Sequence, residues 1–182
     1  AQAEKALETL LPLFNATGQA WMLAWCLSEL SEVHRAQGDQ DEALHRALQA
    51  ARAMEGTRHS IRGGPLTSLW LRLAALHKAR GDRDGARDAL ARLDAMYPDG
   101  LSGLFLPESF LIRAWLDEST ARPTLYQGIA ELQRLRNVLP YATARQLEGL
   151  KGAQALFDAL IELESDRLDP ADLYVSCWRA TC

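Results

Sequence analysis

One fifteen-residue stretch of the chain occurs twice, 43 residues apart, and this repeat constrains the fold more than any other feature of the sequence. Residues 33–47 read VHRAQGDQDEALHRA and residues 76–90 read LHKARGDRDGARDAL. Each copy contains a Gly-Asp pair, at residues 38–39 and 81–82. Glycine suits the left-handed position that ends a helix, and aspartate can accept hydrogen bonds from the free amides that begin the next helix. Each copy therefore predicts a helix, a tight turn and a second helix.

Apolar and small residues recur at matching positions around both turns. Before the turn, Leu27, Leu30, Ser31 and His34 correspond to Trp70, Leu73, Ala74 and His77, and after it Ala43, Ala47 and Ala50 correspond to Ala86, Leu90 and Leu93. Spacings of three and four residues place such side chains on one face of a helix, and small residues let two helices approach closely. We therefore expect these residues to form the core, with both histidines as packing rings and not as metal ligands.

The second copy reads Trp-x-x-Leu-Ala-x-x-His before its turn, with alanine and later Pro98 after it. This pattern resembles the tetratricopeptide (TPR) signature of tryptophan, leucine, a small residue and an aromatic, followed by alanine and proline. The family's usual period is about 34 residues, and the surplus here lies in residues 56–66 and 97–108, which glycine and proline mark as loops. Armadillo and HEAT arrays have periods in the low forties but lack the Gly-Asp turn and the alanines that follow it. The resemblance implies an all-α fold, a right-handed superhelix of antiparallel helix pairs (a TPR-like α-solenoid).

A third copy is expected with Pro123 at the turn, because the residues that follow then match the second copy. Residues 3–10 mimic the second helix of a unit whose first helix would precede residue 1, which suggests an excised or processed piece of a longer protein. After Pro140 a long amphipathic stretch predicts a capping helix, and Asp169 can cap a short final helix. The expected repeats thus span residues 1–140 (a partial unit 1–17, units 20–55 and 66–98, and a degenerate unit 107–140), with C-terminal capping helices over 141–182.

Composition and motifs argue against several functions. A net charge of −4 and a pI near 5.6 do not provide the basic surface that nucleic-acid binding requires. No apolar run approaches the roughly 20 residues that cross a bilayer, and no signal peptide begins the chain. The three cysteines, Cys26, Cys177 and Cys182, lie far apart and read as reduced thiols, which favours the cytoplasm.

No nucleotide-binding or nucleophile motif occurs, and His45 and His59 have no ligand-spaced partners. We therefore expect no enzyme activity, no metal and no cofactor. The partner is expected to be a protein or peptide, with no direct nucleic acid and no membrane, and self-association stays open. The apolar loop residues Leu101, Leu104, Phe105 and Leu106 are a further candidate contact.

The resemblance implies that the first helices of successive pairs line a concave face. The residues expected on that face lie away from the packed stripe; they are Trp25, Ser28, Glu32, Arg35, Leu71, Arg72, Ala75, Lys78, Phe110, Arg113 and Asp117. Ser28 and Glu32 stand where the carboxylate-clamping subfamily has lysine and asparagine, so that function is not supported. The alanine- and arginine-rich repeats are similar to those of large ATP-dependent transcriptional regulators. The alternative to protein binding is therefore an effector-sensing domain that binds a small ligand inside the superhelix.

Overall fold

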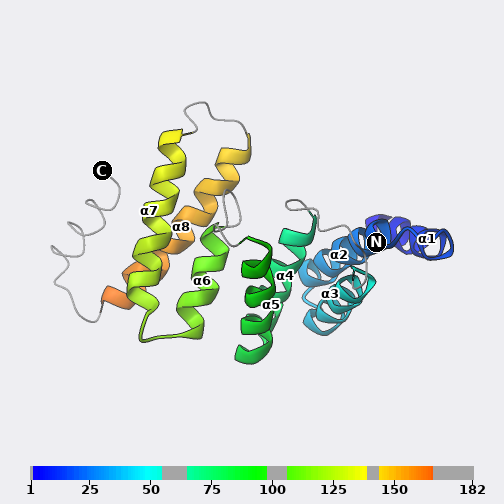
Figure 1. Ribbon diagram of the computed structural model, residues 1–182, viewed down its shortest axis with the longest axis horizontal. Coiled ribbons are helices and arrows are strands. Elements are labelled where there is room, and N and C mark those ends of the chain that lie inside the picture. The colour runs from blue at the N-terminus through cyan, green and yellow to red at the C-terminus, as the bar shows by residue number, and fades with distance from the viewer. Residues whose placement is uncertain (1, 55–64, 98–105, 139–143, 166–182) are drawn as a thin grey trace. The chain divides into compact units, whose positions relative to one another are not determined.

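The computed structural model describes residues 2–54, 65–97, 106–138 and 144–165, which form eight helices and no strand (Figure 1). In chain order the helices are α1 (Gln2–Ala16), α2 (Ala20–Ala36), α3 (Gln40–Met54), α4 (Pro65–Ala79), α5 (Arg83–Met96), α6 (Leu106–Leu116), α7 (Ala121–Val138) and α8 (Ala144–Ser165). The all-α expectation is confirmed for these residues. None of their helices has the length and apolar character needed to cross a bilayer.

The chain divides into two compact units, Ala1–Pro98 and Asp99–Cys182. In the first unit, each of the helices α1 to α4 packs against the next one along the chain. In the second unit, α8 packs against both α6 and α7 (Figure 1). The sequence-based division at residue 140 separates expected repeats from expected capping helices and is not a division into compact units. It stays a prediction.

Three glycines with positive φ end helices of the first unit through the same hydrogen bonds. The φ angles are 65° at Gly18, 85° at Gly38 and 73° at Gly81. In each turn the glycine N–H donates to the carbonyl three residues back, and the following N–H donates to the carbonyl five residues back. This is the Schellman arrangement, in which a left-handed residue satisfies the last carbonyls of a helix. The turns expected at Gly38 and Gly81 are confirmed, and Gly18 makes a third such turn where the expected units 1–17 and 20–55 adjoin.

Both aspartates that follow the repeat glycines cap the next helix. The backbone N–H of Glu42 donates to Asp39 Oδ1 at 3.1 Å, and that of Gly85 donates to Asp82 Oδ1 at 3.0 Å. Each carboxylate thus satisfies an amide that has no partner within its helix. The predicted helix starts are therefore confirmed in both copies.

Small residues let α2 and α3 pack closely. Ala43, Ala47 and Ala50 on α3 are fully buried, and so is Leu30 on α2. The equivalent stripe on α5, from Ala86 to Leu93, is also buried. Trp70 and His77 of α4 are only partly buried, and the guanidinium of Arg92 lies over the Trp70 ring, 5.0 Å from its centroid. The expected core is otherwise confirmed in both hairpins.

In the second unit, α6 meets α7 at Gly128. A Cβ placed on Gly128 would lie 2.9 Å from Cγ of Phe110, so the absence of a side chain lets the aromatic ring approach the α7 backbone. Leu156 and Leu160 of α8 complete this core. Glu164 of α8 is buried, and its Oε1 lies 2.5 Å from Nε of Arg122 on α7.

The turn between α6 and α7 lies at residues 117–120, so the turn expected at Pro123 was wrong. Pro123 lies in the first turn of α7. Proline is tolerated there because the first amides of a helix have no partner within it.

Several expectations fall on residues outside the described ranges. They concern the short helix after Asp169, the side chains of His59, Cys177 and Cys182, and the apolar loop residues Leu101, Leu104 and Phe105. Pro65 begins α4 and Leu106 begins α6, so the last residues of both predicted loops are helical.

Candidate functional site

Arg72 of α4 is joined to α2 by several polar contacts. Its Nη1 donates to both the backbone carbonyl and the hydroxyl of Ser28, the latter at 2.7 Å. Its Nε lies 3.4 Å from Oε2 of Glu32, and its Nη2 lies 3.7 Å from Oε1 of Glu29. The Arg72 side chain is only 15% exposed. Arg72 therefore holds α2 and α4 together, which corrects the expectation that it lies away from the packed side of its helix.

Glu32 links this arginine to a second one. Nε of Arg35 donates to both carboxylate oxygens of Glu32, each at 3.0 Å. The hydrogen bond from Arg35 holds the pKa of Glu32 below its usual value, and the charges of Arg35 and Arg72 act in the same direction against the effect of burial. The structure thus brings together four residues of the predicted face. With Glu29 they form what we call the Arg72 network (Ser28, Glu29, Glu32, Arg35 and Arg72).

Two exposed tryptophans precede this network on α2. Trp21 is 50% exposed and Trp25 is 38% exposed. Steps of four residues lead from Trp21 to Trp25 and on to Glu29, so these side chains lie on the same side of α2. Trp25 was predicted to line the binding face, and Trp21 was not. We call these two residues the tryptophan pair.

Three residues of the predicted face are buried. Leu71 is 2% exposed, Phe110 is 9% exposed, and Ser28 is buried beneath Arg72. Their expected exposure was wrong because their helices are covered on more than one side. Helix α4 packs against both α3 and α5, and α6 packs against both α7 and α8.

The remaining residues of the predicted face are spread over both units. Ala75 and Lys78 of α4 are half-buried, as is Arg113 of α6. Phe110, Arg113 and Asp117 all belong to the second unit. The continuous groove expected across three helix pairs therefore stays a prediction.

Asp117 is exposed and organises the turn after α6. Its Oδ1 accepts hydrogen bonds from the Ser119 N–H at 3.0 Å and from the Ser119 hydroxyl at 2.6 Å. Its Oδ2 accepts a hydrogen bond from the Thr120 hydroxyl at 2.9 Å. The bond from the Ser119 side chain, followed by that from Thr120, lowers the pKa of Asp117. These local contacts explain the position and the lowered pKa of the Asp117 carboxylate without a ligand.

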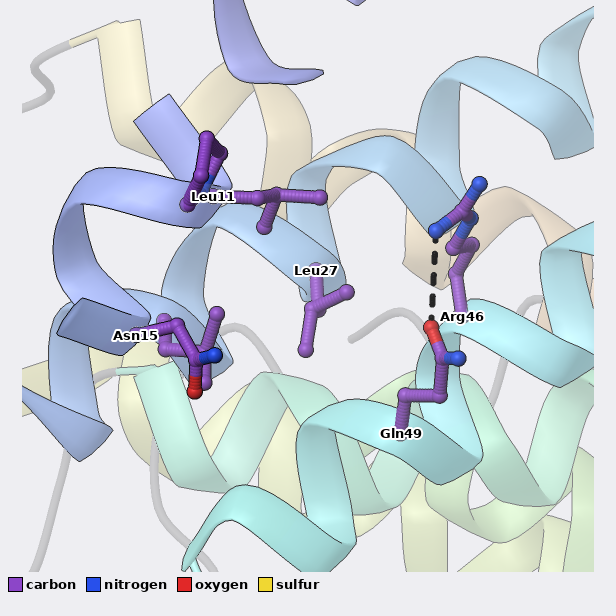
Figure 2. Close-up of a pocket in the computed structure, with 7 residues that line it drawn as sticks. Leu11, Asn15, Leu27, Arg46 and Gln49 are labelled. Carbon is purple, nitrogen blue, oxygen red and sulfur yellow. Dashed lines mark hydrogen bonds between the residues drawn. The ribbon is translucent and has the colours of Figure 1, made fainter. Parts of the chain in front are cut away.

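A pocket of about 300 Å³ lies over α2 and between α1 and α3 (Figure 2). Leu11, Pro12 and Asn15 of α1, Leu23 and Leu27 of α2, and Arg46 and Gln49 of α3 line it. Figure 2 shows Leu27 at its centre, with Asn15 on one side and Arg46 and Gln49 on the other. No short motif encodes this pocket, because its lining comes from three helices. Leu27 was expected in the core.

The titratable side chains of the described residues do not form a metal cluster. Among those residues no group of three or more His, Cys, Asp or Glu side chains could hold a metal ion. Cys26 is buried, and its pKa is raised by burial and by the nearby Glu29 carboxylate, which disfavours the nucleophilic thiolate. Nε2 of His45 and Nε2 of Gln49 lie 3.0 Å apart.

No protein-family model matches this chain, and a search of curated proteins finds no significant match. The fold of the described residues therefore defines the class of protein. These residues form an all-helical protein in which neighbouring helices pack together.

Proposed function

We propose that this chain is a protein- or peptide-binding module of the TPR-like α-solenoid type, a right-handed superhelix of antiparallel helix pairs. Support comes from the two hairpins α2–α3 and α4–α5, which share the same glycine turn, the same aspartate cap and the same buried stripe. Such modules stack similar units and bind partners on the extended surface that stacking creates. We place the module in a larger cytoplasmic regulatory or scaffolding protein, as the resemblance of its repeats implies.

The tryptophan pair is the observation that carries this proposal. Large aromatic side chains are usually buried, and exposed ones on a rigid helix face are typical of binding hot spots. Trp21 and Trp25 lie on α2, whose opposite side is fixed by the buried alanines of α3. The pair therefore offers apolar contact area with little loss of conformational freedom on binding.

The charges beside the tryptophan pair favour a partner segment with a basic residue. Glu29 lies 3.7 Å from Arg72, beyond hydrogen-bonding distance, and its side chain is 42% exposed. A lysine or arginine of the partner can pair with this carboxylate while its aliphatic part packs on Trp25, and a cation over an indole ring adds attraction. We therefore expect an amphipathic helix or an extended peptide with apolar and basic residues.

The test uses peptides selected from a random display library on the wild-type protein and then made synthetically. Isothermal titration compares their affinity for the wild type, for Trp21→Ala/Trp25→Ala and for the control Ile161→Ala, which removes another exposed apolar side chain on α8. Loss of hot-spot contacts should weaken binding about 30-fold or more in the double variant, or ~2 kcal/mol, and leave the control unchanged. Equal affinities for all three proteins would exclude this face.

A further inference from the structure

The pocket over α2 exists because α1 and α3 both pack on that helix and leave a gap between them. Both helices contact α2, and Leu23 and Leu27 form the floor of the gap. Leu11 and Pro12 add apolar surface from α1, while Arg46 and Gln49 form a polar wall from α3 (Figure 2).

The second hairpin has larger side chains at two of the equivalent positions. By the 43-residue spacing, Leu27 corresponds to Trp70 and Gln49 corresponds to Arg92. In the second hairpin the Trp70 ring packs beneath the Arg92 guanidinium, 5.0 Å from ring centroid to Cζ. A leucine is far smaller than an indole, so the first hairpin keeps an open space where the second has a ring and a cation.

Arg46 supplies the charge of the pocket. Its Nε lies 2.7 Å from Oε1 of Glu42, one helical turn away, and its Nη1 donates to Oε1 of Gln49 at the long distance of 3.5 Å. Within the described part of the chain, Nη2 of Arg46 has no acceptor. The outer edge of the guanidinium therefore retains donors that can bind an anion in a bidentate manner.

We propose that this pocket binds a small aliphatic monocarboxylate. The carboxylate accepts hydrogen bonds from Arg46, and the hydrocarbon chain packs on Leu23 and Leu27. A volume of about 300 Å³ is at the lower limit for ligand pockets. It suits a ligand of roughly eight non-hydrogen atoms, each of which needs at most ~30 Å³.

The charge of Glu42 decides between classes of anion. Because this carboxylate already pairs with Nε of Arg46, the net charge near the pocket is small. With no net positive charge to match, a second negative charge on the ligand adds desolvation cost without added net attraction, so a singly charged carboxylate fits better than a dianionic phosphate. This inference goes beyond the proposed peptide binding and does not depend on it, since the tryptophan pair does not line the pocket.

The experiment is a titration of the full chain with hexanoate, in which binding is measured from the backbone amide shifts in NMR spectra. Saturation is expected by ~10 mM, about ten times a dissociation constant of ~1 mM, with the largest shifts in α1 and α3. Because hexanol lacks the charge and hexyl phosphate is a dianion at neutral pH, both should bind at least about tenfold more weakly. The absence of saturable shifts with hexanoate would overturn the proposal, as would equal binding of hexanol.

Two variants locate the binding site. Leu27→Trp fills the pocket with the side chain that the second hairpin has at this place, and it should abolish hexanoate binding while the circular dichroism spectrum stays unchanged. Arg46→Gln keeps most of the side-chain length without the charge and should weaken binding about tenfold or more, whereas the control Arg52→Gln, at an exposed position of α3, should not. Hexanoate binding that survives in both pocket variants would rule out the pocket. If Leu27→Trp does not fold, Arg46→Gln and its control decide.

Discussion

His77 and Asp82 join the end of α4 to the start of α5 through one carboxylate. Nδ1 of His77 lies 2.7 Å from Oδ2 of Asp82, while Oδ1 of Asp82 accepts the N–H of Gly85 at 3.0 Å. The imidazole also occupies the space in which a side chain of residue 85 would stand, because a Cβ there would lie 2.3 Å from Nδ1. The histidine, the capping aspartate and the glycine therefore depend on one another.

Gly85→Ala should destabilise the protein, although alanine is normally better than glycine inside a helix by about 1 kcal/mol. The added methyl group would displace the His77 ring and break its hydrogen bond to Asp82, at a net loss of ~1 kcal/mol or more. The measurement is urea denaturation of the wild type, Gly85→Ala, His77→Ala and the double variant.

The double variant is the control for this mechanism. Without the imidazole, the nearest atom to a Cβ at residue 85 would be Oδ2 of Asp82, at 2.6 Å, which is the end of a side chain that can shift. Gly85→Ala should therefore cost less stability in the His77→Ala protein than in the wild type. If Gly85→Ala destabilises both backgrounds equally, the contact with His77 does not explain why residue 85 is glycine.

Asp82 should make the stability of the first unit depend on pH in the acidic range. The hydrogen bond from Gly85, followed by that from His77, holds the pKa of Asp82 below its ordinary value. A carboxyl group with a lowered pKa contributes stability above its unfolded-state pKa, near 3.9, and loses it as the pH falls through the folded-state value. The melting-temperature advantage of wild type over Asp82→Asn should therefore be full near pH 5 and decline as the pH falls further, a range below the ordinary titration of histidine.

Asp88→Asn is the matched control, because Asp88 is an exposed aspartate of the same helix. It should follow the wild-type pH profile. Parallel profiles for wild type and Asp82→Asn over the whole range would show that the Asp82 carboxylate adds no pH-dependent stability.

The hairpins could be predicted from the sequence because their turns depend on local chemistry. Gly38 and Gly81 need a left-handed backbone, and the aspartates after them serve as caps, so four residues determine two turns. The turn at Gly18 has the same hydrogen bonds but is followed by Gln19, which makes no side-chain capping bond. Because it lacked the Gly-Asp signal, the sequence indicated only a boundary between units there and not the glycine turn itself.

The candidate site was harder to predict because it depends on how many neighbours a helix has. A single apolar stripe predicts one packed side, yet α4 packs against both α3 and α5. Leu71 and Arg72, which face away from the predicted stripe, are therefore enclosed. The pocket beside Leu27 depends on the spacing of three helices, which no local pattern records.

Arg72→Ala should destabilise the protein more than Arg35→Ala does. Loss of Arg72 leaves the Ser28 hydroxyl without this donor in a buried position and removes two ion pairs of limited exposure, at a cost of ~1–3 kcal/mol. Arg35 makes an exposed pair with Glu32, which contributes at most about 1 kcal/mol. Urea denaturation of the two variants checks this difference, and equal midpoints would show that Arg72 is not structural. Arg72 is therefore unsuitable as a binding-site variant, unlike the tryptophan pair.

Ala86→Asp should be strongly destabilising, by ~3 kcal/mol or more, because it places an unpaired carboxylate in the closed contact between α4 and α5. Ala86 has no exposed surface. Ala91 is an exposed residue inside the same helix. Ala91→Asp therefore loses a similar amount of helix propensity, up to about 0.7 kcal/mol, but buries no charge. The comparison by thermal denaturation thus isolates the effect of burial. Ala43→Asp, at the equivalent and fully buried position of α3, should behave like Ala86→Asp. If all three variants melt together near the wild type, the alanines are not close helix contacts and the repeat alignment that equates the two hairpins is wrong.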